Sequence, residues 1–372
     1  MNQSASSAPP AMNDASGTSD KFLLQAGVHD INGAFAYGAI CRAIAVDPDL
    51  IALAAHCRPG QVIPHFFMGV LHYVALRYPQ HAFAEFFPSI APKPRPPAQI
   101  APVLKAFCSA HRDEIIAVAS TRTCQTTAVD RAPTILLSLD FVARRAGAPL
   151  SLIEVGCSAG LLLMFDRFGY DFGPGGTIGD PDSPVRVRPV FRGTPPTVPA
   201  RLPPIAWRVG VDLHAVEVGD SEVRRWIQAQ TFPEWVDEAA RTRAALEMRA
   251  GHALDIRIGD ALDLVPSLVR ERPDPVCVLH SNCLYQWSLA QRERFDALLR
   301  DVSRGRVLHR VGIETSDAAL YNAPAYMREH GEFPPVEILY TEYRDGAGSA
   351  PRVLGLTEGY GRWMQWNVHP AG

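Results

Sequence analysis

The sequence predicts an α/β protein: a mixed β-sheet with helices on both faces, preceded by an all-helical N-terminal subdomain. Residues 21–149 carry apolar side chains at helical spacing, and no run there alternates as a strand does. From residue 150 onward, short apolar runs alternate with helical segments, which indicates a parallel sheet flanked by helices. Residues 336–366 read as two or three strands around Asp345-Gly346, and this terminal hairpin makes the sheet mixed.

Composition bounds the class of protein. The chain has 372 residues, of which 47% are hydrophobic and 20% are charged, with a formal net charge of −3. This is enough for a sizeable core and excludes a disordered protein, a disulfide miniprotein and a fibrous repeat. The near-neutral charge argues against broad electrostatic binding to nucleic acid.

Cysteine usage and hydropathy predict a cytoplasmic protein without a membrane partner. Seven scattered cysteines are an odd number, which favours reduced thiols over a disulfide framework. No apolar run reaches the roughly 18 residues of a membrane helix. Residues 1–20 lack the basic start and apolar stretch of a signal peptide, so we expect a disordered tail there.

The helical region, 21–149, contains one clear break. The apolar residues Ile100, Val103, Leu104 and Phe107 recur at helical spacing. The proline-rich segment 92–97 divides the region into two helical groups. A polar stretch, 123–131, opens the last helix before the sheet, either as a lid over a later site or as an ordinary capped helix start.

The α/β domain, 150–372, is expected to contain five strands with helices between them. The strand candidates are SLIEV, IAWRVGV, LDIRI, PVCVLHS and RVLHRVGI. Two helix starts are expected, from the capping-box spacing of Thr231 and Glu234 and from Ser288 as an N-cap. Residues 173–206 are too rich in Pro and Gly for a helix, so we expect an insertion containing a short hairpin.

A glycine turn follows the first strand, in the sequence Leu152–Gly160 (LIEVGCSAG), and the apolar run LLLMFDRF follows it. Glycine lets the backbone approach a ligand closely and adopt positive φ. We expect the apolar run to form a helix whose N-terminus presents free N–H groups to a ligand. Such a turn can also serve only tight packing between a strand and a helix.

Glu154 lies two positions before the first glycine, and this resembles the first motif of S-adenosylmethionine-dependent methyltransferases (acidic-x-Gly-x-Gly-x-Gly). Ser158 stands at the position of the middle glycine. The resemblance implies a Rossmann-type domain that binds S-adenosylmethionine through Glu154, Gly156, Cys157, Ser158 and Gly160. The nicotinamide-binding pattern G-x-G-x-x-G is not matched.

The same residues, 156–160, also match G-x-S-x-G, the nucleophile elbow of α/β-hydrolases. Asp260 and His280 follow in the order that a triad with Ser158 requires. The helical region supplies no earlier strands for an oxyanion loop, and the elbow leaves Glu154 unexplained. The methyltransferase interpretation is therefore preferred, and a serine esterase is the alternative.

Two later strand ends carry further cofactor candidates. Asp212 follows the second strand, where a carboxylate can accept hydrogen bonds from ribose hydroxyls. Its separation from the glycines is wide because residues 173–206 intervene, so it could instead cap a loop. Asp260 and Ala261 follow the third strand and resemble the adenine-binding position of methyltransferases, or they simply begin a helix.

The fourth strand places His280, Ser281 and Tyr285 at its carboxyl end, where ligands of open α/β sheets bind. His280 is a candidate general base and Tyr285 a candidate wall of the substrate site, whereas Ser281 is assigned to the cofactor side. A strand-end histidine with satisfied hydrogen bonds is an equal alternative. Cys277, His280 and Cys283 cannot converge along an extended strand, so we expect no metal site.

The combination of a helical N-terminal part, a Gln-Thr stretch, E-x-G-x-S-A-G-L, R-x-x-Y-D (Arg167, Tyr170, Asp171) and G-D-P-D-S-P-V resembles an uncharacterised bacterial family, domain-of-unknown-function family 2332. The resemblance covers residues 25–366. Cys157 and Leu162 depart from the Ala and Asn usual there. The family looks like a methyltransferase-type Rossmann fold and implies no substrate.

The sequence thus predicts methyl transfer from S-adenosylmethionine to a small-molecule N, O or S nucleophile. Such chemistry depends mainly on positioning, with one base at most. Ser158 in place of glycine, and the lack of an N/D-P-P-Y type motif after the fourth strand, keep a non-catalytic binding protein as a further alternative. The sequence indicates no oligomeric state.

Overall fold

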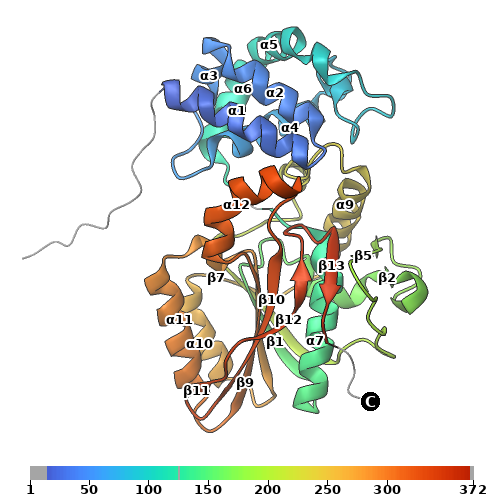
Figure 1. Cartoon of the computed structure of the whole chain (residues 1–372), viewed down its shortest axis with the longest axis vertical. Helices are drawn as coiled ribbons and strands as arrows, with labels where there is room; N and C mark the ends of the chain where they lie inside the picture. Colours follow the sequence, from blue (N-terminus) through green and yellow to red (C-terminus); the bar gives the residue numbers. More distant parts are fainter. Residues whose placement is uncertain (1–14, 125, 369–372) are drawn as a thin grey trace, which may run out of the picture. The chain divides into compact units, whose positions relative to one another are not determined.

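The computed structural model describes residues 15–124 and 126–368 (Figure 1). The chain forms two compact units: the first runs to Thr126 and includes Arg225–Ala239, and the second comprises Thr127–Arg224 and the residues from Ala240 onward. The first unit therefore ends earlier than the expected helical subdomain, 21–149, because α7 (Ala132–Ala146) belongs to the second unit and packs on η4 (Leu162–Arg167) there.

The first unit is helical, as the apolar spacing predicts. Its helix α1 begins at Ala15, so the expected tail of residues 1–20 is helical from that residue on, and residues 1–14 lie outside the described part. No α-helix of the described residues crosses the proline-rich segment 92–97. The helices are α1 (Ala15–Ile31), α2 (Phe35–Ala45), α3 (Pro48–Ala54), α4 (Ile63–Arg77), η1 (Ala84–Phe86), η2 (Pro97–Gln99), α5 (Ile100–Ala110) and α6 (Arg112–Thr121).

The second unit contains a mixed sheet of ten strands in the order β5-β13-β12-β10-β9-β8-β1-β6-β7, with β11 paired to β10. Five neighbouring strands, from β9 to β7, are parallel, and β10, β12 and β13 form the antiparallel extension that the terminal residues predict. The strands are β1 (Leu150–Val155), β5 (Val190–Phe191), β6 (Ile205–Asp212), β7 (Ile256–Ile258), β8 (Val276–Ser281), β9 (Val307–Glu314), β10 (Val336–Arg344), β11 (Ala347–Gly348), β12 (Arg352–Thr357) and β13 (Trp363–Trp366).

Helices lie on both faces of this sheet (Figure 1). On one face α10 (Ala261–Arg270) and α11 (Leu289–Val302) pack side by side over a buried apolar cluster that includes Ile153 and Val155, while α7 lies on the other face. The remaining helices that include residues of this unit are η3 (Val129–Arg131), α8 (Ser221–Gln228), α9 (Val236–Ala250), η6 (Leu284–Gln286) and α12 (Asp317–His330).

The segment after the glycine turn differs from the expectation. No α-helix follows Gly160: the apolar run forms η4, a 3-10 helix, and β2 (Gly169–Asp171) begins two residues after it. Strand β2 pairs antiparallel with β3 (Thr177–Gly179) and parallel with β4 (Arg186–Val187), so the expected short hairpin is present but starts before residue 173. A further 3-10 turn, η5, spans Gly173–Gly175.

One of the two expected helix caps is correct. Ser288 caps α11 in a capping box with Gln291. Thr231 caps no helix, because α9 begins only at Val236. The carboxylate of Glu234 instead accepts a hydrogen bond of 2.6 Å from the backbone N–H of Ala36 within the first unit, so a tertiary contact takes the group that the local motif would have used.

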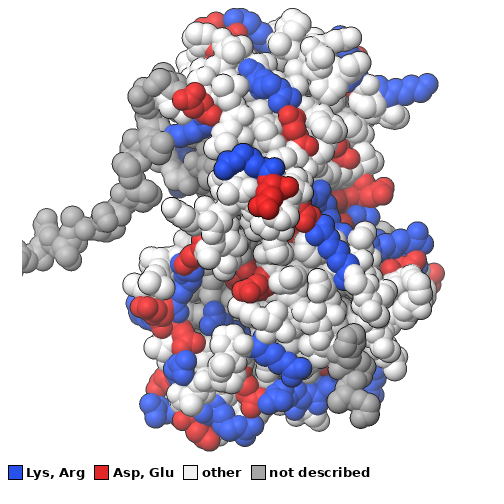
Figure 2. Space-filling view, viewed as in Figure 1, with Lys and Arg blue, Asp and Glu red and all other residues white. Residues whose placement is uncertain are grey.

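Acidic and basic side chains are interspersed over the face drawn in Figure 2. Among the described residues, every helix is too short or too polar to cross a membrane.

Candidate functional site

The candidate site lies where β1 ends between its two parallel neighbours, β6 and β8. From β1 the chain order continues to β6 and β7 on one side and to β8 and β9 on the other. Such a reversal leaves a crevice at the carboxyl ends of the strands, which is where open α/β sheets bind ligands. Side chains alternate along β1, so Glu154 points away from the face on which Ile153 and Val155 join the α10–α11 cluster.

Glu154 is a buried acid with an unused acceptor. The residue is 3% exposed, and its Oε2 atom is buried without a hydrogen-bond partner. Burial raises the pKa of Glu154 to about 8, the charge of Arg131 opposes this shift, and the charge of Asp212 adds to it. The carboxyl group is therefore mostly protonated at pH 7 and ready to ionise beside a cation.

The turn after β1 is tightly constrained. Gly156, Ser158 and Gly160 have φ values of 73°, 51° and 74°, in the left-handed region. A Cβ on Gly156 would collide with the side chain of Cys283, so this position accepts only glycine. Ser158 adopts a conformation that costs a non-glycine residue on the order of 1 kcal/mol or more.

Three backbone donors of this turn bond strongly inside the protein. Gly156 donates to the carbonyl of Val211, Ser158 donates to the carboxylate of Asp212, and Gly160 donates to the carbonyl of Cys157, each at 2.8 Å. The α-helix expected after the turn is replaced by the 3-10 helix η4. These three N–H groups of the turn are therefore not open to a ligand.

Cys157 and Ser158 take different positions within the turn. Cys157 is buried, and its Sγ packs where a Cβ on Gly210 of β6 would lie. Burial raises the pKa of the Cys157 thiol far above the ordinary value, so it is not a nucleophile at neutral pH. The Oγ atom of Ser158 is buried and has no hydrogen-bond partner.

Asp212 and Asp260 stand at the ends of neighbouring strands. Asp212 accepts from the N–H groups of Ser158 and His214, which leaves lone pairs for further donors. Asp260 accepts from the N–H of Leu262 at 2.8 Å and caps α10, as its alternative interpretation predicts, and the buried Ala261 starts that helix. The backbone N–H of Gly259 donates to the carbonyl of Asp212, which holds these two strand ends together.

Arg131 is a site residue that the sequence indicates only as the end of the polar stretch 123–131, without a role of its own. It is 5% exposed, and its guanidinium donates to both the carbonyl and the hydroxyl of Ser281, at 3.2 and 2.9 Å. The hydroxyl of Ser281 is thus held by an arginine whose charge also acts on Glu154. The sequence signal was the polar stretch 123–131, which ends with Asp130 and Arg131 directly before an apolar helix. Asp130 pairs with Arg241 at 2.5 Å.

His280 is enclosed by its neighbours. Its Nε2 accepts from Arg310 at 2.9 Å, and its Nδ1 therefore carries the proton and donates to Glu314 at 2.7 Å. Burial and the charge of Arg310 lower the pKa of His280, although Glu314 opposes this. The ring is 2% exposed, so the geometry favours the alternative of a satisfied strand-end histidine.

Glu314, at the end of β9, also binds the chain that follows β8. Its carboxylate accepts from the backbone N–H groups of Cys283, Leu284 and Tyr285 at 3.0 to 3.3 Å. Burial raises the pKa of Glu314, but the hydrogen bond from His280 and those from the amides of Leu284 and Cys283 lower it more. Tyr285 is 38% exposed, so it is held at the crevice by its backbone while its side chain stays accessible.

The arrangement assembles neither a metal site nor a serine triad. No three His, Cys, Asp or Glu side chains in the described part of the chain are grouped to hold a metal ion. Asp260 caps α10 and both ring nitrogens of His280 are bonded elsewhere, so no base reaches Ser158 from either expected partner.

The chain was compared with known proteins. No curated protein and no solved structure matches it. Residues 19–366 match the model of DUF2332, described as an uncharacterized protein conserved in bacteria. The match covers most of both units. The chain therefore belongs to the DUF2332 family of uncharacterised bacterial proteins, as the combination of sequence motifs indicates.

Proposed function

We propose that this protein transfers a methyl group from S-adenosylmethionine to a small-molecule N, O or S nucleophile, with the cofactor at the carboxyl ends of β1, β6 and β7. The observation that carries the proposal is the buried, unpartnered Oε2 of Glu154 at the point where the strand order reverses. A buried acceptor without a partner is costly unless a ligand satisfies it.

The residues of the turn fit a ligand rich in donors and positive charge. Glu154 can accept from an ammonium group, Asp212 retains lone pairs for ribose hydroxyls, and Asp260 retains an oxygen for an amino group on a base. S-adenosylmethionine carries all three kinds of donor and supplies an electrophilic methyl group when bound. A phosphate-rich dinucleotide fits poorly, because three N–H groups of the turn are already bonded within the protein.

The chain's own contribution to such a reaction would be binding and orientation. Arg131 donates to Ser281 at the end of β8, and Glu314 accepts from the backbone that carries Tyr285. The end of β8 and the segment that follows it are therefore fixed. His280 has no free lone pair to take a proton. The acceptor group would therefore be one that reacts without a protein base, such as an amine or a thiolate.

The test is calorimetric titration of the full chain with S-adenosylmethionine and with its demethylated product. We expect saturable binding that Glu154→Ala weakens by about 1–3 kcal/mol, because the charged donor loses its buried acceptor. Glu293→Ala, on an exposed position of α11, is the matched control and should leave the affinity unchanged. Binding that survives Glu154→Ala in a folded protein removes Glu154 from the site.

Two alternatives make different predictions. A non-catalytic binding protein would bind the cofactor without turnover of any nucleophile, and the strained Ser158 is compatible with it. An α/β-hydrolase-like esterase would show a Ser158 that reacts with a fluorophosphonate. No α-helix directly follows the turn, and the two expected triad partners, Asp260 and His280, are bonded elsewhere, which argues against the esterase.

A further inference from the structure

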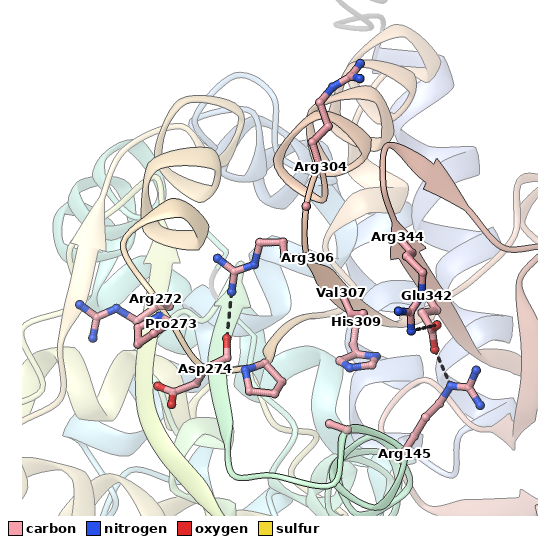
Figure 3. A pocket seen from close by; sticks show the side chains of 13 residues that line it. Arg145, Arg272, Pro273, Asp274, Arg304, Arg306, Val307, His309, Glu342 and Arg344 are labelled. Carbon is pink, nitrogen blue, oxygen red and sulfur yellow. Dashed lines mark hydrogen bonds and ion pairs between the residues drawn. The ribbon is translucent and has the colours of Figure 1, made fainter.

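A cavity lies at the amino ends of the parallel strands, opposite the end that carries Glu154, and nothing in the proposed function uses it. Its volume is about 720 Å³, within the range of small-molecule sites. It is lined by residues next to the amino ends of β1, β8 and β9 and by the end of β10, all within the second unit (Figure 3).

The lining of this cavity, which we call the arginine cavity, is strongly basic. Two carboxylates line it, those of Asp274 and Glu342. Five arginines also line it: Arg145, Arg272, Arg304, Arg306 and Arg344. Burial lowers the pKa of His309, which also lines the cavity, to about 4, so this ring is neutral at pH 7. The side-chain charges leave an excess of three positive charges.

Helix ends explain part of this excess but not all of it. Helices α7, α10 and α11 end at this edge, and cationic side chains commonly compensate the negative end of a helix dipole. Each helix end is equivalent to about half a negative charge, so three of them offset about 1.5 charges. A positive charge of about 1.5 remains for a ligand to neutralise.

The guanidinium groups have donors to spare. Arg306 lies in the middle of the residues labelled in Figure 3 and donates to the carbonyls of Val269 and Asp274, not to a carboxylate. The Nε atoms of Arg306 and Arg272 are buried without hydrogen-bond partners. On the other side Arg145 and Arg344 share a single carboxylate, that of Glu342. At the rim, Arg304 pairs with Asp301 at 3.4 Å and the guanidinium of Arg272 lies over the ring of Trp207.

We propose that the arginine cavity binds a small diphosphate-bearing anion. Guanidinium groups match phosphate oxygens in geometry and charge. Several guanidinium groups together therefore bind a multiply charged anion more tightly than they bind a ligand with one carboxylate. Arg306 would contact the anion centrally, and Arg344 and Arg145 would contact it from one side. This site is separate from the crevice at Glu154.

The test is calorimetric titration of the full chain at low ionic strength with sodium pyrophosphate and with ADP. We expect saturable binding at one site per chain. Arg344→Ala, at an exposed position, should weaken pyrophosphate binding by about tenfold, as expected for one lost charge-assisted contact. Arg294→Ala, an exposed arginine of α11 outside the cavity, is the matched control and should leave the affinity unchanged.

A second variant should increase the affinity for pyrophosphate. Glu342→Gln keeps the size of the side chain but removes the competing carboxylate, so pyrophosphate should bind several-fold more tightly. A structural role for Glu342 alone would not increase affinity. ADP that binds like pyrophosphate identifies the diphosphate as the whole determinant, whereas tighter ADP binding adds a nucleoside contact, and both results support the proposal.

Three results would overturn this inference. They are the absence of saturable pyrophosphate binding, an equal loss in Arg344→Ala and Arg294→Ala, and an unchanged affinity in Glu342→Gln. Single-stranded RNA that binds through Arg344 more tightly than pyrophosphate does would also overturn it, in favour of a nucleic-acid surface.

Discussion

The backbone N–H of Ser158 donates a hydrogen bond of 2.8 Å to Oδ2 of Asp212, and this bond ties the glycine turn after β1 to the end of β6. It fixes two candidate ligand residues that lie far apart in the sequence. It also uses a donor that an anion-binding turn would have left open.

Ser158→Gly is expected to leave the fold and cofactor binding intact. Glycine adopts φ near 51° without strain, and this gain offsets its extra flexibility of about 0.5–1 kcal/mol in the unfolded chain. Ser158→Val should destabilise clearly, because a β-branched residue is strained at this φ. Thermal unfolding and cofactor titration measure both effects. Lost binding in a folded Ser158→Gly protein would show that the hydroxyl contacts the ligand.

Glu154→Gln is expected to change how stability depends on pH. The unfolded carboxyl loses its proton near the ordinary value of 4.5, whereas the folded one keeps it up to about 8. Wild-type stability therefore falls as pH rises through this window, by on the order of 3 kcal/mol at pH 7. Glu154→Gln carries no such penalty. Denaturant unfolding at pH 5 and pH 7.5 should show a variant advantage that grows with pH, and the exposed Glu293→Gln serves as the control.

Cofactor binding is expected to release a proton from Glu154. The carboxyl is mostly neutral at pH 7 without ligand and ionises beside an ammonium group, so affinity should rise with pH until about 8. Titrations in two buffers of different ionisation enthalpy report the proton directly. An enthalpy that is the same in both buffers would mean that Glu154 does not face the cation.

His280→Asn is expected to act on stability rather than on a proton-transfer step. Asparagine cannot reach Arg310 and Glu314 together, so at least one buried partner loses its bond, at a cost of about 1–3 kcal/mol. Cofactor affinity in the folded variant should match wild type. The exposed His330→Asn controls for the loss of an imidazole elsewhere. Wild-type stability combined with turnover reduced about 100-fold would instead make His280 a base.

Local sequence was sufficient for the regular elements of both units. Apolar runs with strand character, such as 152–155 and 276–281, became buried parallel strands, because such runs satisfy a sheet covered on both faces. Asp345 and Gly346 adopt φ values of 50° and 84°, which is the turn chemistry that joins β10 to β11. The capping box at Ser288 is likewise a property of four consecutive residues.

The prediction from local sequence was wrong for the fully buried segment after Gly160, where we expected an α-helix. The run after Gly160 is apolar at every position from Leu161 to Phe165, and all five residues are buried. Without polar residues to set a period, such a run does not distinguish a helix from other buried structure. The pairing of β2 with β3 and β4 takes the residues from Gly169 on, and the run before β2 forms a 3-10 helix.

By itself, therefore, the sequence determined the strands, the helices of the first unit, the glycine turn and the acids Glu154 and Asp212 at the strand ends. Only the tertiary structure decided which groups these residues meet. It brought Arg131 to Ser281, Arg310 and Glu314 to His280, and five arginines to one cavity, from positions far apart in the chain. Hydrogen bonds and charges act over a few ångströms in space, and spacing along a chain specifies such distances only within a single element.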